Sequence, residues 1–445
     1  MGESIYAFCF RINGAGGDVC VILKPCRRGR LRYLKTVQAG TPALPIFGKM
    51  KILFVTPVIP TQTDGRRPYN YLKYLSKRHD VRLITMKLPE QTEDDAQHIR
   101  EMGVPTTTID IIPFRSCMKS VIGLLRGDPL RVSWCRYEEM RTAIRQALNQ
   151  DHFDIAHFDR MRMGQFAQGI PCPTLIDFTD SLVMYFQRTL RHRQKFFEWC
   201  IDRWELATIP RFERNVLPFF DAAIVCSLID ADVFHRYHPE YEFEVIANGV
   251  DLQQFSPKSH PAGHAPRCVI TGTLFYFPNI DSIRFYRESI LPDIRRRFPW
   301  IETDVIGTRP IREMQNLDGR DGIHILSDVP RMEDHLYQDD IYLCPLRVAA
   351  GIRNKILEAM AAGMPIITTR LGTEGLELKH EKEVLFAETG REFAEQIEQL
   401  IQTPELGRQL GKNARAYVEE RHRFDVLGAK LENLYERLIT RSKSS

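Results

Sequence analysis

The stretch IYLCPLRVAAGIRNKILEAMAAGMPIITT, residues 341–369, places a strand, a helix and a second strand in close succession. Two short apolar runs flank a helical pattern that ends at Ala-Gly-Met-Pro. Gly363 suits a left-handed helix cap, and Pro365 suits the start of the next strand. Because parallel strands need a crossover of this kind, the stretch predicts a βαβ unit in a parallel sheet.

The same rhythm runs through the chain from residue 50 onward. In the first half the predicted strands are KILFVT, DVRLIT, FDIAHF, PTLIDF and AAIVCS, with helices over 68–77 and 196–219 and a helix cap at Ser227 and Asp230. In the second half they are CVITGT, ETDVIG, IHILS, IYLCPL and PIITT, with helices over 279–296, 332–339, 354–363 and 392–402. The sequence therefore predicts an α/β fold with two Rossmann-like, doubly wound sheets.

The predicted domain boundary lies near VIANGVDLQQFSP, residues 245–257, which is followed by a linker rich in Pro, Ser, Gly and His. We expect a first domain over 50–250, a second over 251–425, and a C-terminal helix over 426–445 that packs back on the first. A helical pattern from Asn413 to Ile439 is interrupted near residues 424–427.

Composition narrows the class of protein. The apolar runs are shorter than the roughly 20 residues that a membrane span needs. The ten cysteines are scattered without CxxC pairs or histidine clusters at ligand spacing, which argues against structural zinc and against a secreted disulfide framework. We expect a cytoplasmic protein without metal, cofactor or nucleic-acid partner.

The net charge of +4 is unevenly distributed. Residues 1–49 hold eight Lys/Arg and two Asp/Glu, which leaves 53 against 55 for the rest. This basic N-terminal extension is interpreted as a poorly ordered tail, or as an over-called start if Met50 begins the protein. Within it, INGAGGDVCVIL, residues 12–23, predicts a hairpin rather than a dinucleotide loop, because a strand stands where that loop needs a helix.

Three stretches together resemble the retaining GT-B glycosyltransferases, most closely the sugar transferases of bacterial exopolysaccharide systems: NGVD, TGTLFYFPNIDSIRFY and CPLRVAAGIRNKILEAMAAGMPIITTRLGTEGL. The resemblance spans residues 50 to about 440 and is most specific over 245–376. It implies a GT-B fold in which two domains face a cleft. It also implies transfer of a sugar from a UDP- or GDP-linked donor to a glycan or lipid-linked acceptor, in cell-surface polysaccharide biosynthesis.

The helix predicted over 352–362 carries the main donor-binding candidates. Gly351, Lys355 and Glu358 share one stripe of it, and its N-terminus would face the crevice at the carboxyl edge of the sheet. Amides at Gly351 and Ile352 suit a diphosphate, with Arg353 or Lys355 adding positive charge. Glu358 can accept hydrogen bonds from vicinal ribose hydroxyls, and the corresponding acid of the resembling family binds the ribose. The alternative is a Lys355–Glu358 pair on a solvated face.

Other donor contacts rest on the resemblance, with two departures. Gly272 stands where the family contacts the donor, or it marks a plain turn at the end of a strand. The pair Asp328-Val329 resembles the family loop that holds the base by its backbone. The family's second acid is replaced by Ala350, and its diphosphate-binding arginine and lysine by Thr273 and Pro278. Arg353 and Lys355 are expected to compensate.

The first domain is expected to carry the acceptor side. Gly65 would allow close approach to the donor phosphates, with Arg66 as electrostatic partner, or the loop is simply a solvated turn. The catalytic candidates are polar residues after two predicted strands: His157, Asp159 and Arg160 after FDIA, and Asp180 after PTLI. A structural role for His157 is the alternative.

The implied mechanism is retaining and metal-independent, because helix amides and cations would neutralise the leaving nucleoside diphosphate. Two alternatives remain open: a GT-B-type sugar-nucleotide epimerase, and a catalytically weak protein that binds nucleotide sugars.

Residues 116–148 mix basic and large apolar side chains in a composition that suits an anionic lipid surface, on the inner face of the cytoplasmic membrane. We favour the alternative, in which these helices pack toward the core.

Overall fold

The computed structural model describes residues 22–24, 32–34, 48–62, 65–261 and 263–444. The chain divides into two compact units, Met1–Ile46 and Phe47–Ser445. In the first unit, strand β1 (Ile22–Lys24) pairs antiparallel with β2 (Arg32–Leu34). The turn predicted within residues 12–23, and most of the N-terminal extension, lie outside the described residues.

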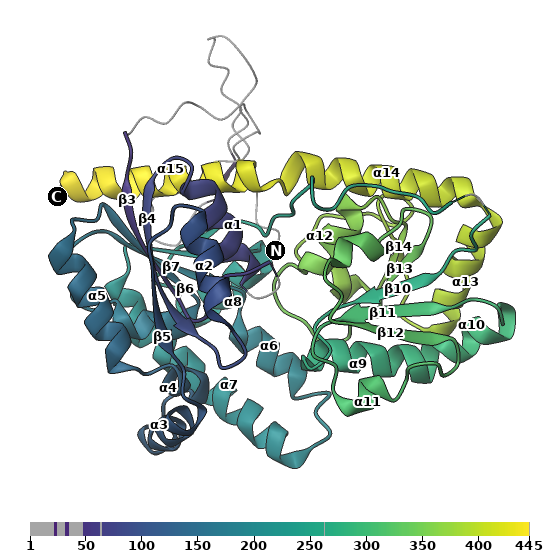
Figure 1. Cartoon of the computed structure of the whole chain (residues 1–445), viewed down its shortest axis with the longest axis horizontal. Helices are drawn as coiled ribbons and strands as arrows, with labels where there is room; N and C mark the ends of the chain where they lie inside the picture. Colours follow the sequence, from purple (N-terminus) through teal and green to yellow (C-terminus); the bar gives the residue numbers. More distant parts are fainter. Residues whose placement is uncertain (1–21, 25–31, 35–47, 63–64, 262, 445) are drawn as a thin grey trace, which may run out of the picture. The chain divides into compact units, whose positions relative to one another are not determined.

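The second unit contains two parallel sheets, which Figure 1 labels. The first has the order β5-β4-β3-β6-β7-β8-β9, and every neighbouring pair is parallel. Its strands are β3 (Lys51–Thr56), β4 (Asp80–Lys87), β5 (Thr106–Asp110), β6 (Ile155–Asp159), β7 (Thr174–Thr179), β8 (Ala222–Val225) and β9 (Phe243–Val245). We call this sheet with its helices the first lobe.

Alternating side chains of β3 bury both faces of this sheet. Ile52 and Phe54 belong to one core, with α1 (Arg66–Leu75), α2 (Glu93–Glu101) and α15 (Phe424–Lys443). Leu53 and Val55 belong to another, with α5 (Glu138–Gln150). A strand covered on both faces explains why KILFVT is a continuous apolar run rather than an alternating one.

The second lobe contains the other sheet, of order β12-β11-β10-β13-β14-β15. Its strands are β10 (Cys268–Thr271), β11 (Thr303–Gly307), β12 (Ile323–Ser327), β13 (Ile341–Cys344), β14 (Ile366–Thr368) and β15 (Leu385–Phe386). One face is covered by α9 (Phe277–Phe285), α10 (Leu291–Arg297) and α13 (Gly390–Gln402), and the other by α12 (Asn354–Ala361) and α14 (Pro404–Arg421). The predicted pair of doubly wound sheets is confirmed.

Most predicted elements form within a few residues of the expected bounds, and one does not. The segment 332–339 forms only a short 3₁₀ helix, η4 (Met332–His335), because Leu336 adopts an extended backbone and its side chain is buried. β5 was missed because TTTID has no continuous apolar run.

The two lobes are joined at one place by two chain segments. The backbone nitrogen of Val250 donates to the oxygen of His422 at 2.8 Å, and Nδ1 of His422 lies 2.8 Å from the oxygen of Asn248. Before His422, α14 packs on the second lobe through Ala414 and Val418. After His422, α15 packs on the first lobe. Figure 1 shows the two helices in yellow, running one after the other across the lobes.

Helix α3 (Pro113–Arg126) differs from the favoured interpretation. Instead of packing toward the core, it exposes a row of large apolar side chains: Phe114, Met118, Val121, Ile122, Leu124 and Leu125. Within the described residues, no helix is long and apolar enough to cross a membrane.

Candidate functional site

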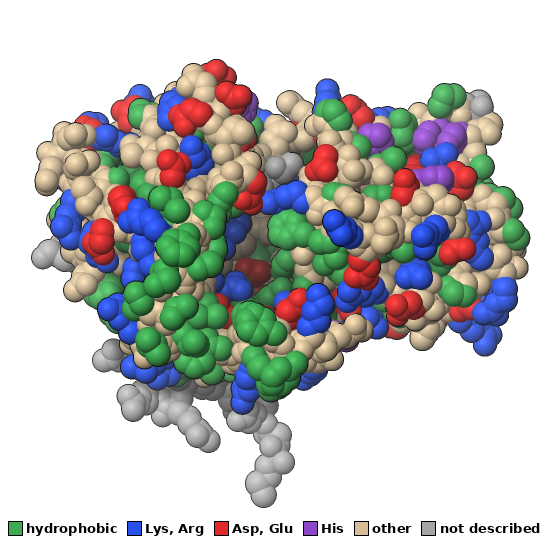
Figure 2. Space-filling model, turned by 60° about the horizontal axis from the view of Figure 1, so that its bottom comes forward, with side chains coloured by type: hydrophobic (Ala, Val, Ile, Leu, Met, Phe, Trp, Pro, Cys, Tyr) green, Lys and Arg blue, Asp and Glu red, His purple; other side chains and the backbone are tan. Residues whose placement is uncertain are grey.

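The carboxyl ends of both sheets open on a cleft of about 620 Å³. Thr179 at the end of β7 and Thr271 at the end of β10 line it from the two lobes. Figure 2 shows the hollow between the lobes, with acidic and basic side chains inside it. This is the position at which open α/β sheets bind ligands.

Glu358 lies on this cleft and not in solvent. It is on α12, its exposed fraction is 4%, and it forms an ion pair with Arg66 at the start of α1. The helix begins at Asn354, two residues later than predicted, with Arg353 as its N-cap. The structure therefore joins two predicted donor-binding residues, one from each lobe, across the cleft.

Gly351 lies at a contact between the lobes. A Cβ atom on this residue would stand 2.8 Å from Cβ of Asp180 and 3.2 Å from Sγ of Cys226, and its φ is +70°. The amide of Ile352 donates to the same sulfur at 3.3 Å. The sequence predicted that the amides of Gly351 and Ile352 bind a diphosphate. For Ile352 this prediction is corrected, because its amide already donates to Cys226 of the first lobe.

Arg353 lines the cleft, but its guanidinium is committed to the protein. It donates to the backbone oxygens of Gly351, Leu371 and Glu374. It therefore holds the loop that precedes α12, and its expected role as a free counter-charge for the diphosphate is corrected to one of support.

Lys355 is the cation of α12 that faces the cleft. Its Nζ donates to Oδ1 of Asn279 at 2.7 Å, and burial lowers its pKa. Asn279 also explains Gly272, since a Cβ there would stand 2.6 Å from Nδ2 of Asn279. Gly272, Asn279 and Lys355 thus form one polar cluster at the carboxyl end of β10.

The first lobe contributes four of its predicted residues to the lining: Gly65, Arg66, Arg160 and Asp180. Gly65 is the N-cap of α1 and has a left-handed backbone conformation, with φ of 69°. Arg66 is therefore the first residue of the helix. Burial, reinforced by Asp230, raises the pKa of Asp180 to about 6. Asp180 can therefore change its protonation state near neutral pH.

His157 lies in the core of the first lobe rather than on the cleft. Its ring stacks on Phe54 at 4.2 Å, its Nδ1 lies 2.6 Å from Oη of Tyr435, and burial lowers its pKa well below the usual value. β6 continues to Asp159, so His157 stands inside the strand and not after it. A catalytic role loses its geometric basis, and these contacts favour the structural alternative.

Asp159 is also buried and does not line the cleft. Its Oδ2 has no hydrogen-bond partner among the described residues, and it lies 3.7 Å from Nε of Arg160. Burial raises its pKa to about 7. Asp159 was expected to contact substrate. The structure corrects this, because its side chain is buried beside Arg160 and outside the lining of the cleft.

We expect Asp159→Asn to stabilise the protein at pH 8 and to have little effect near pH 4. The carboxyl is easier to ionise in the unfolded chain, at about 3.8, than in the fold, at about 7, so its burial lowers the unfolding free energy progressively across that range. Each unit of difference between the pKa values of the folded and unfolded chain corresponds to about 1.4 kcal/mol of unfolding free energy. Urea unfolding at both pH values measures this, and equal effects at pH 4 and pH 8 would contradict it.

Val329 lines the cleft and Asp328 does not. Asp328 has φ of 52°, and its Oδ1 accepts from the amide of Arg309 at 3.1 Å. The side chain thus orders the loop that presents Val329, which agrees with a backbone rather than a side-chain role for this pair.

Sequence reasoning missed several cations of the cleft. Of the described residues that line it, nine are Lys or Arg and four are Asp or Glu: Arg66, Arg67, Lys73, Arg131, Arg160, Arg162, Arg309, Arg353 and Lys355, against Asp180, Asp251, Glu333 and Glu358. Arg162 could have been found, since it follows the polar end of β6, whereas Arg131 reaches the cleft from a separate helix, α4 (Leu130–Trp134). The surplus of positive charge favours an anionic ligand.

Comparison with known proteins matches residues 265–403 to the family described as Glycosyl transferases group 1. A phosphatidyl-myo-inositol mannosyltransferase of Propionibacterium freudenreichii is 30% identical over 180 residues, which cover 38% of this chain and 44% of the relative. The chain spans less than two thirds of the length of the curated relatives it matches.

Solved structures match over most of the chain. Sucrose-phosphate synthase from Thermosynechococcus elongatus has a TM-score of 0.64 at 16% identity, over 88% of this chain and 100% of the other. Anabaena Alr3699/HepE in complex with UDP and glucose has a TM-score of 0.62 at 14% identity, over 87% and 100%. At this identity the likeness establishes the fold, which is the predicted GT-B arrangement.

Proposed function

We propose that this chain, which carries a glycosyl transferases group 1 domain on a GT-B fold, is a glycosyltransferase that uses a nucleotide-diphosphate sugar. The observation that carries the proposal is the burial of Glu358 on a cleft rich in cations, opposite Arg66. A buried carboxylate can bind ribose hydroxyls, and the surrounding cations can neutralise a diphosphate. A UDP-linked donor is supported by the complex of HepE with UDP-glucose, and GDP is the second candidate.

Donor binding would exchange one ion pair for others. In this structure Arg66 is paired with Glu358. When a ribose occupies the carboxylate, Arg66 is displaced toward the phosphates, where charge-assisted hydrogen bonds are stronger than neutral ones. Lys355, Gly272 and Asn279 line the same side of the cleft and would contact the same diphosphate.

The reaction is proposed to proceed with retention and without a metal. The acceptor hydroxyl, from a glycan or a lipid-linked acceptor, attacks the anomeric carbon on the face of the leaving group, and a phosphate oxygen takes its proton. Asp180 and Arg160 line the first-lobe side of the cleft, where they would contact the acceptor or the donor sugar. Closure of the lobes excludes water.

The experiment is a thermal-shift screen of nucleotide sugars, followed by turnover of the stabilising donor with lipid-linked glycan intermediates of the source cell. At a concentration of about 100 times its dissociation constant, a ligand stabilises the fold by about 2.7 kcal/mol. Release of nucleoside diphosphate that requires acceptor and persists in EDTA supports the proposal. Epimerised sugar without acceptor would identify an epimerase, and binding without any turnover would identify a catalytically weak binding protein.

Peripheral attachment to an anionic membrane is a further part of the proposal. Leu125 and Phe114 on α3 have exposed fractions of 84% and 76%. Phe196 and Phe197, at the start of α7 (Phe196–Val216), are similarly exposed, and Trp204 of α7 donates to the oxygen of Asp128 beyond α3 at 3.0 Å.

Figure 2 shows apolar side chains gathered on this face beside the cleft. The basic residues Arg115, Lys119 and Arg126 lie on the same helix. An apolar face with cations at its margin suits an anionic bilayer surface, and a cleft beside that surface could receive a lipid-linked acceptor.

We expect the double substitution Phe114→Glu and Leu125→Glu to reduce flotation with phosphatidylserine vesicles at least about tenfold, because burying one large apolar side chain contributes about 1.5–3 kcal/mol. Trp300→Glu is the matched control, since Trp300 is an exposed aromatic residue of the second lobe. Unchanged flotation of the double variant, or failure of the unaltered protein to bind vesicles at low salt, would reject the membrane surface.

A further inference from the structure

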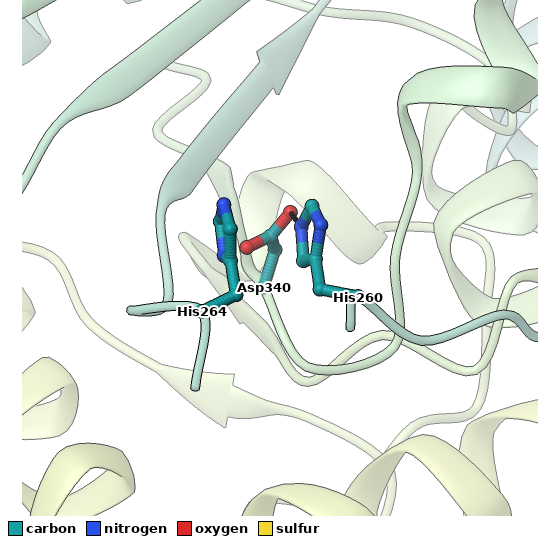
Figure 3. A group of neighbouring side chains, drawn as sticks. All are labelled: His260, His264 and Asp340. Atoms are coloured by element: carbon teal, nitrogen blue, oxygen red, sulfur yellow. Dashed lines mark hydrogen bonds and ion pairs between the residues drawn. The ribbon is translucent and has the colours of Figure 1, made fainter. Parts of the chain in front are cut away.

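Three potential metal ligands meet on the second lobe, outside the lining of the cleft. His260 and His264 belong to the linker before β10, and Asp340 directly precedes β13. One ligand atom of each lies within 4.8 Å of the others. Figure 3 shows the two rings and the carboxylate together.

Neighbouring groups hold two of the three ligands in place. The ring of His260 stacks on both Tyr337 and His264, with centroids 3.7 Å apart in each pair. Nε2 of His260 lies 2.9 Å from Oδ2 of Asp340, whose Oδ1 accepts from the amide of Arg267 at 3.0 Å. Such contacts orient metal ligands before the ion arrives.

The charges of the cluster favour a cation. Asp340 is buried, and a buried carboxylate needs a compensating positive charge. The exposed Asp339 adds a second carboxylate, which accepts from the amide of His260 at 3.2 Å.

We propose that His260, His264 and Asp340 bind one Zn²⁺ ion. Two imidazoles and a carboxylate form a ligand set typical of zinc, at metal–ligand distances of about 2.0–2.2 Å. Tetrahedral coordination at these distances places the ligand atoms about 3.3–3.6 Å from one another. Nε2 of His260 and Oδ2 of Asp340 are already 2.9 Å apart, so the exposed side chain of His264 would supply the remaining movement. A water would complete the coordination.

The proposed ion would fasten the linker to the second lobe. It would tie His260 and His264 to Asp340, the residue before β13, next to the start of β10. The three ligands lie outside the lining of the donor cleft. The sequence alone did not bring these three residues together, because Asp340 lies 76 residues after His264.

The test is titration of ZnCl₂ into the tag-free chain after chelator treatment, followed by calorimetry and melting temperature. We expect one equivalent to bind with a micromolar or lower dissociation constant and to raise the melting temperature. His264→Ala removes a direct ligand and should weaken binding by more than the roughly 10- to 100-fold that follows from removing a group that only orients a ligand. Because His264 is exposed, this variant should fold. Co²⁺ should give the visible absorption of a tetrahedral site, and His264→Ala should lose it.

His235→Ala is the matched control, since His235 is an exposed histidine on α8 (Leu228–Tyr237) of the first lobe. Zinc affinity of this variant should equal that of the unaltered chain. Millimolar binding, or binding that His264→Ala does not change, would overturn the proposal. The affinity for a nucleotide sugar, measured with and without chelator, is expected to be unchanged, so failure of the zinc site and failure of the donor site give different results.

Discussion

Glu358→Ala is expected to reduce the affinity for the donor nucleotide about 30- to 700-fold while the protein stays folded. Hydrogen bonds to a charged group contribute about 1.5–3 kcal/mol each, and loss of the ribose contacts should remove about 2–4 kcal/mol in all, at about 1.4 kcal/mol per tenfold. Calorimetric titration with the donor found by thermal shift measures the effect.

The matched control for this substitution is Glu333→Ala. Glu333 also lines the cleft on the second lobe, but it is paired with Arg331 of its own loop rather than with the opposite lobe. We expect it to change donor affinity no more than about threefold, because its ion pair stays within one lobe and its partner Arg331 is largely exposed. Glu358→Ala with unaltered donor affinity would remove the basis of the proposed function, whatever the control does.

Gly351→Ala is expected to lower the unfolding free energy by about 2–5 kcal/mol and to reduce turnover roughly 100-fold. A residue with a side chain at φ of +70° costs about 1–2 kcal/mol. The new methyl group would also collide with Cβ of Asp180 at 2.8 Å, which adds about 1–3 kcal/mol of overpacking. Relief of the collision requires the lobes to separate, and a displacement of about 1 Å at a reaction centre can cost about 100-fold in rate.

Gly319→Ala separates the two causes. Gly319 has the same φ of +70°, but no atom lies within 4 Å of the place its Cβ would take. It should therefore show the backbone cost alone, with normal turnover. If both variants lose equal stability and neither loses turnover, the contact between Gly351 and the first lobe has no part in positioning the cleft.

The sequence was sufficient for the fold and for the position of Glu358. Apolar runs separated by helical patterns correspond to β3, β10 and β13 because buried parallel strands must be apolar on both faces. Glu358 was predictable because a carboxylate in an otherwise apolar helix needs a polar or charged partner. In an open parallel sheet, ligands bind at the carboxyl ends of the strands, which the start of this helix follows. These are local or periodic signals.

Other features depend on contacts that no local pattern contains. The sulfur of Cys226 that accepts from Ile352 lies 126 residues before it in the chain. His157 was misplaced because β6 extends to Asp159, and the end of a strand is not marked when its last residues include buried polar ones. The amphipathic pattern of α3 was visible, but periodicity does not say whether protein or solvent meets the apolar face.

The adjacency of Asn248 and His422 sets the way in which the lobes can move. Because both covalent crossings pass through one spot, joined by hydrogen bonds at 2.8 Å, that spot can serve as a pivot. A few degrees of rotation there would leave both sheets intact and produce the largest displacement at the far rim of the cleft. Torsional change in a handful of residues at this pivot is then sufficient for the chain to admit a donor and release a nucleotide.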